Sequence, residues 1–168
     1  MYSMKRILVI GSPGAGKTYF SKKLAQILDL PLIHMDNLYW NEKKESISRE
    51  ELINKLNPYL KQDKWIIDGN YHHTLELRLK YATDVFFLDL SRKECIQGIL
   101  ERVDQKRDDI PWIETKEDAE ELIKWTESYE ERTKDEEIAL LNKNKHIVVH
   151  TFSSRKEVND YLNSLKDK

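Results

Sequence analysis

The sequence predicts an α/β protein built on a parallel sheet with helices on both faces. Five short apolar runs, at residues 6–10, 32–35, 65–67, 85–88 and 146–151, alternate with longer amphipathic patterns. The runs are continuously apolar or β-branched, which is typical of strands buried on both faces. Strand and helix patterns that alternate in this way predict a three-layer α/β/α sandwich with right-handed crossovers.

The four main helical patterns have recognisable beginnings. The first runs from residue 17 to residue 28, directly after a glycine-rich turn. Three others begin at the capping-box sequences Ser48–Glu51, Ser91–Glu94 and Ser154–Glu157, where a serine hydroxyl can accept a hydrogen bond from the third helical amide. A further long, polar helical stretch is predicted from about residue 116 to residue 141.

Size and composition indicate one domain, residues 1–168, of 20.0 kDa. The formal charge of -2 gives no overall attraction to nucleic acid or anionic lipid. The single cysteine, Cys95, excludes an intrachain disulfide and agrees with a reducing compartment. The N-terminus does not have the pattern of a signal peptide, and no apolar run reaches the roughly 18 residues of a membrane helix. We therefore expect a cytoplasmic protein, and the sequence leaves its oligomeric state open.

The stretch GSPGAGKT matches the phosphate-binding loop pattern G-x-x-x-x-G-K-[ST] and has a strand before it and a helix after it. Glycines let successive backbone N–H groups turn toward one anion, and the helix N-terminus adds its positive dipole. Lys17 would contact the β- and γ-phosphates, and the Thr18 hydroxyl would bind Mg²⁺. The predicted nucleotide-binding residues are Gly11, Ser12, Pro13, Gly14, Ala15, Gly16, Lys17, Thr18 and Tyr19.

Acidic residues follow the second, third and fourth apolar runs, at the edge where open α/β sheets bind ligands. Asp68 ends a run of the Walker B type and would support Mg²⁺ together with Thr18. Asp36 would orient or deprotonate a phosphoryl acceptor, although a helix cap is nearly as good an explanation. Asp89 more simply ends its strand.

Phosphoryl transfer also needs cations around the transferred group. Arg102, Arg107 and Arg132 lie in or after segment 102–116, which has little periodicity and predicts a short lid over the nucleotide. Each of these arginines has the alternative of being an ordinary surface charge. Segment 37–63 is expected to bind the acceptor, with Tyr39 and Trp40 stacking on a ring or packing in the core. Gly69, Asn70 and Arg78, which follow the third run, are further candidates for acceptor contacts.

Several stretches together resemble the bacterial DNA topology modulation proteins (FlaR-like), a branch of the adenylate-kinase-like P-loop kinases. These stretches are VIGSPGAGKTYFSKKLA, PLIHMDNLYW, WIIDGNYHHTLELRL, VFFLDLSRKECIQGILERV and KRDDIPW. The resemblance covers nearly the whole chain, and the D-x-x-x-W and WIIDGNY elements are more specific than the phosphate loop.

This resemblance implies a five-stranded parallel sheet of order 2-3-1-4-5 and Mg-ATP bound at residues 11–18. It implies an acceptor-binding role for Asp36, lid-flanking positions for Arg102 and Arg107, and backbone contacts of residues 152–154 with adenine. Asp68-Gly69 matches the Asp-Gly of adenylate kinases, but Asn70-Tyr71-His72 replaces their Phe-Pro-Arg. The acceptor therefore stays open between a nucleotide, a nucleoside and another small molecule.

The leading prediction is an ATP- and Mg²⁺-dependent kinase of a small acceptor. A GTPase is disfavoured because Asn142-Lys143-Asn144-Lys145 lacks the aspartate of the guanine-reading N-K-x-D motif. The alternative is a nucleotide-binding regulatory protein that modulates DNA topology without kinase activity. Direct DNA binding is not expected, because Lys43, Lys44, Lys61, Lys64, Lys143 and Lys145 are interleaved with acidic residues.

Overall fold

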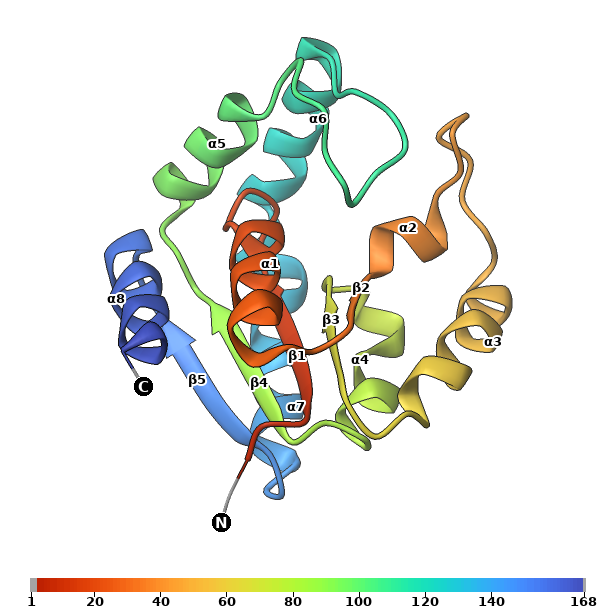
Figure 1. Cartoon of the computed structure of the whole chain (residues 1–168). Coiled ribbons are helices and arrows are strands. Elements are labelled where there is room, and N and C mark those ends of the chain that lie inside the picture. The colour runs from red at the N-terminus through yellow and green to blue at the C-terminus, as the bar shows by residue number, and fades with distance from the viewer. Residues whose placement is uncertain (1–2, 168) are drawn as a thin grey trace.

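The computed structural model describes residues 3–167, apart from the side chains of residues 130 and 131. Of the predicted domain 1–168, residues 1, 2 and 168 thus lie outside the described residues. Five parallel strands form one sheet of order β2-β3-β1-β4-β5 (Figure 1). The strands are β1 (Arg6–Gly11), β2 (Leu32–His34), β3 (Trp65–Asp68), β4 (Asp84–Leu88) and β5 (Val148–Phe152). The predicted three-layer α/β fold and its strand order are confirmed.

Helices cover both faces of the sheet. The α-helices are α1 (Lys17–Leu28), α2 (Met35–Tyr39), α3 (Arg49–Leu60), α4 (His72–Leu79), α5 (Arg92–Glu101), α6 (Lys116–Glu127), α7 (Asp135–Lys143) and α8 (Arg155–Lys166). A π-helical turn, η1 (Glu130–Lys134), joins α6 to α7. In Figure 1, α5 and α6 rise beyond the strand ends, next to the first turn of α1. No described helix has the length and apolar character needed to cross a membrane.

Two apolar clusters hold the layers together, and β1 contributes to both. Leu8 and Ile10 pack into one cluster with buried residues of α3, α4 and α7. Ile7 and Val9 point to the other cluster, with buried residues of α1 and α8. All four side chains are fully buried. A continuous apolar run is therefore required in β1, because neither face of this strand meets water.

The three predicted serine caps are confirmed, since Ser48, Ser91 and Ser154 each accept a hydrogen bond from the third helical amide. Among the described helices, the complete reciprocal capping box is instead the one at Thr115 and Asp118 at the start of α6.

The long helical stretch predicted from about residue 116 to residue 141 is helical over nearly its whole length, but the π-helical turn η1 divides it into α6 and α7. A π-helical turn inserts a residue and rotates the helix face that follows. Tyr129 and Glu137 flank this turn, and both are buried. Their side chains are hydrogen-bonded to each other, with Tyr129 as the donor. This internal polar contact is invisible to a pattern of hydrophobic residues.

The carboxyl ends of the strands lie together at one edge of the sheet. Val9 and His34 are each in register with Asp68, and Gly11 is in register with Leu88. The run predicted at 32–35 ends one residue early, because Met35 begins α2. Asp36 consequently lies in the first turn of a short helix rather than in a loop.

Candidate functional site

The loop between β1 and α1 forms a positively charged turn. Gly14 and Gly16 have φ angles of 80° and 90°, a region that strongly favours glycine. Gly16 precedes α1 and has no side chain to cap it, so the first helix amides do not donate to an N-cap side chain. The Lys17 ammonium lies over the loop and donates to the carbonyls of Gly11 (2.8 Å) and Ser12 (3.0 Å). Helix amides and a cation at one turn make a site suited to a phosphate group.

Helix α5 supports this loop from behind by an unusually close backbone contact. A Cβ atom added at Gly98 would lie 2.2 Å from the Gly14 carbonyl oxygen. A Cβ added at Gly14 would lie 2.0 Å from the carbonyl oxygen of Cys95. Both glycines are therefore required for the loop to rest against α5, and Gly98 has no place in the loop motif itself.

We expect Gly98→Ala to lower the free energy of unfolding by about 1–3 kcal/mol, as overpacking does. Alanine is the better helix former, so propensity alone would stabilise the protein by about 1 kcal/mol. The methyl group must displace the phosphate loop, so nucleotide affinity should fall as well. Urea denaturation and calorimetry measure the two effects. Gln97→Ala, at an exposed position of α5, serves as the control. A variant that is stabilised and binds nucleotide normally would contradict this packing argument.

Asp68 and His34 form a buried pair at the ends of β3 and β2. The His34 Nδ1 atom lies 2.7 Å from an Asp68 carboxylate oxygen, and both side chains are less than 10% exposed. Burial disfavours protonation of His34, but the hydrogen bond and the negative charge of Asp68 outweigh it and raise the pKa of His34. One oxygen of the predicted Walker B carboxylate is thus engaged by a residue on the neighbouring strand.

Asp36 lies at the same edge and is hydrogen-bonded to Tyr71, whose hydroxyl donates to the Oδ1 atom of Asp36. Burial raises the pKa of Asp36, although the Tyr71 hydrogen bond opposes this. Burial lowers the pKa of Lys17, and the charges of Asp36 and Asp68 counteract that shift. The structure therefore brings Lys17, Asp36 and Asp68 within electrostatic reach of one another.

Asn70 links Gly11, the first residue of the phosphate loop, to Glu137 of α7. Its Oδ1 atom accepts from the Gly11 amide at 2.7 Å, and its Nδ2 atom donates to Glu137 at 2.8 Å. Burial raises the pKa of Glu137, with the hydrogen bond from Tyr129 acting in the opposite direction. Because both ends of its side-chain amide are hydrogen-bonded, Asn70 holds the loop in place in this structure. The acceptor contact predicted for Asn70 stays a prediction.

Arg78 holds up the loop after β3 from inside the protein. Its side chain is fully buried, and burial lowers its pKa to about 10. The guanidinium donates to the carbonyls of Gly69 (2.8 Å), Asn70 and Tyr71 (3.2 Å). The predicted acceptor contact of Arg78 is thus replaced by a supporting one. Gly69 is structural too, since a Cβ there would lie 2.8 Å from the Cβ of Met35.

The predicted lid, residues 102–116, is irregular through residue 115 and folds onto the phosphate loop. The Thr18 hydroxyl donates to the Oδ2 atom of Asp109 at 3.0 Å. Arg107 makes a two-pronged contact with Asp109 and an ion pair with Glu114. Arg102 lies 3.3 Å from Glu114, and burial lowers its pKa to about 10. Both predicted lid arginines thus stand beside the loop and are held by acids of their own segment.

The lid also meets the acceptor segment. The Asn37 side chain donates to the Asp108 carbonyl at 2.9 Å, and Lys22 of α1 pairs with the Asp108 carboxylate. The rings of Trp40 and Trp112 meet edge to face with centroids 5.8 Å apart. The Tyr39 ring lies between those of Trp40 and Tyr71, with centroids 4.9 and 5.0 Å away. Aromatic side chains therefore line the side of the site that carries Asp36.

The side chains of two predicted site residues make contacts outside the phosphate loop. Arg132 in η1 stacks on the exposed ring of Trp125 at 3.5 Å and donates to Ser128 and to the Trp125 carbonyl. Its contacts hold the α6–η1 junction together, and its predicted catalytic role stays a prediction. The Tyr19 side chain is 53% exposed and faces Asn159 of α8, with the oxygens 3.4 Å apart. Only the backbone of Tyr19 remains a candidate for phosphate contact.

Four residues of the site were missed in the sequence: His34, Tyr71, Asp109 and Glu137. The sequence did contain a signal for Asp109, because this residue belongs to an acidic pair in the lid next to Arg107. His34 and Tyr71 flank predicted acids or turns, but nothing local shows which partner they meet. Glu137 is 67 residues from its partner Asn70 in the sequence, so no local pattern connects it with the site.

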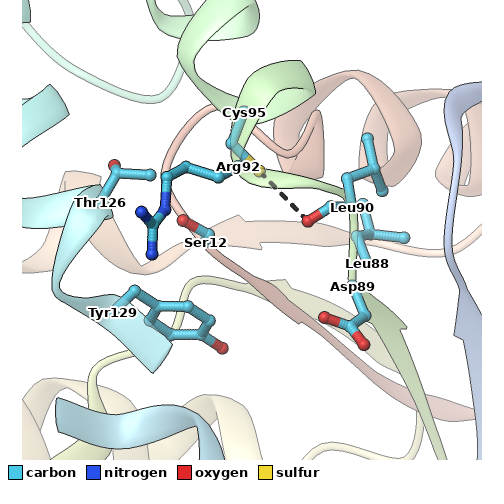
Figure 2. Close-up of a pocket in the computed structure, with 8 residues that line it drawn as sticks. All are labelled: Ser12, Leu88, Asp89, Leu90, Arg92, Cys95, Thr126 and Tyr129. Atoms are coloured by element: carbon cyan, nitrogen blue, oxygen red, sulfur yellow. Dashed lines mark hydrogen bonds between the residues drawn. The ribbon is translucent and has the colours of Figure 1, made fainter. Parts of the chain in front are cut away.

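A small cavity of about 20 Å³ lies beside the phosphate loop. Figure 2 shows it between Ser12, the end of β4, the start of α5 and the α6–η1 junction, with Arg92 pointing toward Thr126. This volume holds about one water molecule. It is lined by none of residues 13–18, so it belongs to the packing behind the loop and not to the phosphate-binding side.

The side chains around Thr18 suit a magnesium ion that arrives with a nucleotide. A hydroxyl and carboxylates supply the oxygen ligands that Mg²⁺ prefers. Among the described side chains, which exclude those of residues 130 and 131, no group of three or more acidic, histidine or cysteine residues forms a metal cage. Mg²⁺ is usually held by one or two protein oxygens together with substrate phosphates. Thr18 and Asp68 therefore remain the expected residues for it.

Comparison with known proteins agrees with this architecture. No protein-family model and no curated protein matches the chain. Among solved structures, shikimate kinase from Bacteroides thetaiotaomicron matches with a TM-score of 0.62 and 18% sequence identity, over 98% of each chain. The resemblance to DNA topology modulation proteins stays a prediction. The chain thus shares the fold of this shikimate kinase, and residues 11–18 lie at the carboxyl edge of its sheet.

Proposed function

We propose that the protein is a Mg²⁺- and ATP-dependent phosphotransferase that acts on a nucleotide, a nucleoside or a similar small acceptor. One observation carries the proposal. The phosphate loop, the carboxylates of Asp36 and Asp68, and a lid bearing Arg102 and Arg107 converge around Lys17 and Thr18. A protein that only binds a nucleotide has no need of an additional buried carboxylate and an aromatic-lined side next to the phosphate loop.

In this proposal the loop amides and Lys17 bind the ATP phosphates, and Thr18 and Asp68 hold the magnesium ion. Magnesium would neutralise phosphate charge and orient the nucleotide. Arg102 and Arg107 would exchange their present acidic partners for the charge that develops on the transferred group. Closing of the lid would exclude water, which otherwise competes with the acceptor.

Asp36 would receive the proton of an acceptor hydroxyl or orient a phosphate acceptor. Its buried carboxylate lies on the aromatic-lined side, where Tyr39 and Trp40 would pack against the acceptor. A raised pKa makes a carboxylate a better proton acceptor once it is ionised. Transfer to a hydroxyl then breaks the acceptor O–H bond and the ATP Pγ–O bond, forms the new P–O bond, and releases ADP.

The test is a phosphotransfer screen with γ-labelled ATP over nucleosides, nucleoside monophosphates and small hydroxyl-bearing metabolites. We expect Asp36→Asn to lower kcat on the best acceptor by about 100-fold or more while ATP affinity stays within about twofold, as loss of a general base does. Asp29→Asn is the control, because Asp29 is exposed at the far end of α1 in a left-handed conformation that asparagine tolerates. Equal loss of ATP binding in Asp36→Asn, or no transfer to any acceptor, would contradict the proposal.

A further inference from the structure

The hydrogen bond between Thr18 and Asp109 joins the phosphate loop to the lid, the two segments expected to enclose a nucleotide. The donor is the hydroxyl expected to bind magnesium, and the acceptor is a carboxylate of the lid, 91 residues away. Asp109 is only 3% exposed although it belongs to an irregular surface segment. A buried carboxylate aimed at this hydroxyl calls for a functional explanation.

The position of Asp109 is fixed by its own neighbours. The Arg107 guanidinium donates from Nε to Oδ1 at 2.9 Å and from Nη2 to Oδ2 at 2.5 Å. Glu114, which is 5% exposed, holds Arg107 from the other side. Burial opposes ionisation of Asp109, but its hydrogen bonds and the charge of Arg107 outweigh it and lower the pKa of Asp109. Asp109 is thus a pre-oriented, ionised hydrogen-bond acceptor.

A hydroxyl group that gives an oxygen lone pair to a metal ion still carries one proton, which needs an acceptor. Such outer hydrogen bonds orient the ligand and strengthen its interaction with the metal. In this chain, Asp68 is hydrogen-bonded to His34 at 2.7 Å, whereas Asp109 already accepts the proton of Thr18 at 3.0 Å. Because the hydroxyl uses its proton in this contact, both lone pairs of the Thr18 oxygen remain available to a metal ion.

We propose that Asp109 is a positioning residue that orients the Thr18 hydroxyl toward the metal of the bound nucleotide, so that metal binding and lid closure stabilise each other. The inference rests on the proposed use of Mg²⁺ and ATP. It follows by linkage that magnesium favours the closed lid by the same free energy by which the closed lid favours magnesium. The lid then closes over the metal-loaded nucleotide in preference to the metal-free one.

The first test measures ATP affinity by calorimetry with excess Mg²⁺ and with EDTA. In Asp109→Asn we expect the gain in affinity that Mg²⁺ provides to fall about 10-fold relative to the unsubstituted protein, which is the lower end for loss of an outer hydrogen bond. Affinity in EDTA should not weaken, since no phosphate contact is removed. Asp104→Asn is the matched control, because Asp104 is an exposed lid residue in a left-handed conformation that asparagine tolerates.

A second test works on the nucleotide-free protein and from the other end of the hydrogen bond. Thr18→Ala should speed amide hydrogen exchange across residues 102–114, whereas Thr18→Ser, which keeps the hydroxyl, should not. A residue that served only as a metal ligand would leave this exchange unchanged in both variants. The second test does not depend on Asp109→Asn being well folded.

The outcomes separate the two claims. An unaltered Mg²⁺ gain in Asp109→Asn, equal tightening of ATP with and without Mg²⁺, or unchanged exchange in Thr18→Ala would overturn the role of Asp109. Equal tightening of ATP binding with and without Mg²⁺ would mean that Asp109 only hinders ATP from entering the phosphate loop. Absence of any ATP binding by the unsubstituted protein would instead overturn the proposed function.

Discussion

We expect Lys17→Ala to lose nearly all of the proposed phosphoryl transfer and to leave the fold intact. The Lys17 ammonium is the one cation placed by the loop motif itself, and loss of a charged group that stabilises the transition state costs about 100- to 1000-fold in kcat. Its own contacts in this structure are two loop carbonyls, at 2.8 and 3.0 Å. Burial lowers the pKa of Lys17, which means that folding disfavours its charge, so its removal should destabilise the protein less than removal of the fully buried Arg78 does.

Steady-state transfer with labelled ATP and a thermal melt measure the two parts of this result. Lys23→Ala is the control, since Lys23 is on the same helix and lies over the Tyr19 ring, 6.0 Å from its centroid. We expect Lys23→Ala to match the unsubstituted protein in both measurements. A Lys17→Ala protein that keeps more than half of the normal turnover would disprove the assignment of the phosphate loop, whatever its melting temperature.

Arg78→Met is expected to lower the free energy of unfolding by about 3–5 kcal/mol, the range found when one partner of a buried charged contact is removed. Arg78 is fully buried, and its guanidinium satisfies the carbonyls of Gly69, Asn70 and Tyr71. Methionine fills a similar volume but leaves three carbonyls without this donor, and each unsatisfied buried group costs about 1–3 kcal/mol. Tyr71 has a φ of 37°, so the loop is also held in a costly conformation that Arg78 supports.

Urea denaturation gives the change in stability. Arg78→Lys should show part of the same loss of stability, because an ammonium cannot reach three carbonyls with the geometry of a guanidinium. Arg49→Met is the control, since Arg49 is exposed and donates to a single carbonyl, that of His73, at 3.3 Å. We expect a change within about 0.5 kcal/mol there. If Arg78→Met and Arg49→Met proved equally stable, the buried arginine would not support the loop.

The two parts of the site differ in how far the sequence alone revealed them. Residues 11–18 form a contiguous motif, and the placement of Lys17 and Thr18 follows from the loop and the helix after it. The acceptor side is assembled from separate strand ends and loops. Asp36 and Asp68 were predicted from their place after apolar runs, and the parallel sheet brings them together. Their partners Tyr71 and His34 were not predicted, because a hydrogen bond between side chains has no local sequence pattern.

The arginines show most clearly how little the sequence alone reveals about where a charged side chain lies. Four of them had similar standing in the sequence as cations near a lid or loop. In the structure, Arg102 and Arg107 lie in the lid beside Thr18, Arg78 is buried under a loop, and Arg132 stacks on Trp125. The difference comes from burial and from the carbonyls and acids that happen to surround each guanidinium after folding.

The sequence by itself determined the layered α/β fold and the phosphate loop, because both depend on short-range patterns: continuous apolar runs, glycine spacing and helix caps. Only the tertiary structure decided that α5 presses on the loop through Gly98, that Asn70 ties the loop to Glu137, and that Asp109 meets Thr18. These contacts join residues 59 to 91 positions apart or backbones in close approach. They are set by how packed layers bring distant segments together, which no local pattern encodes.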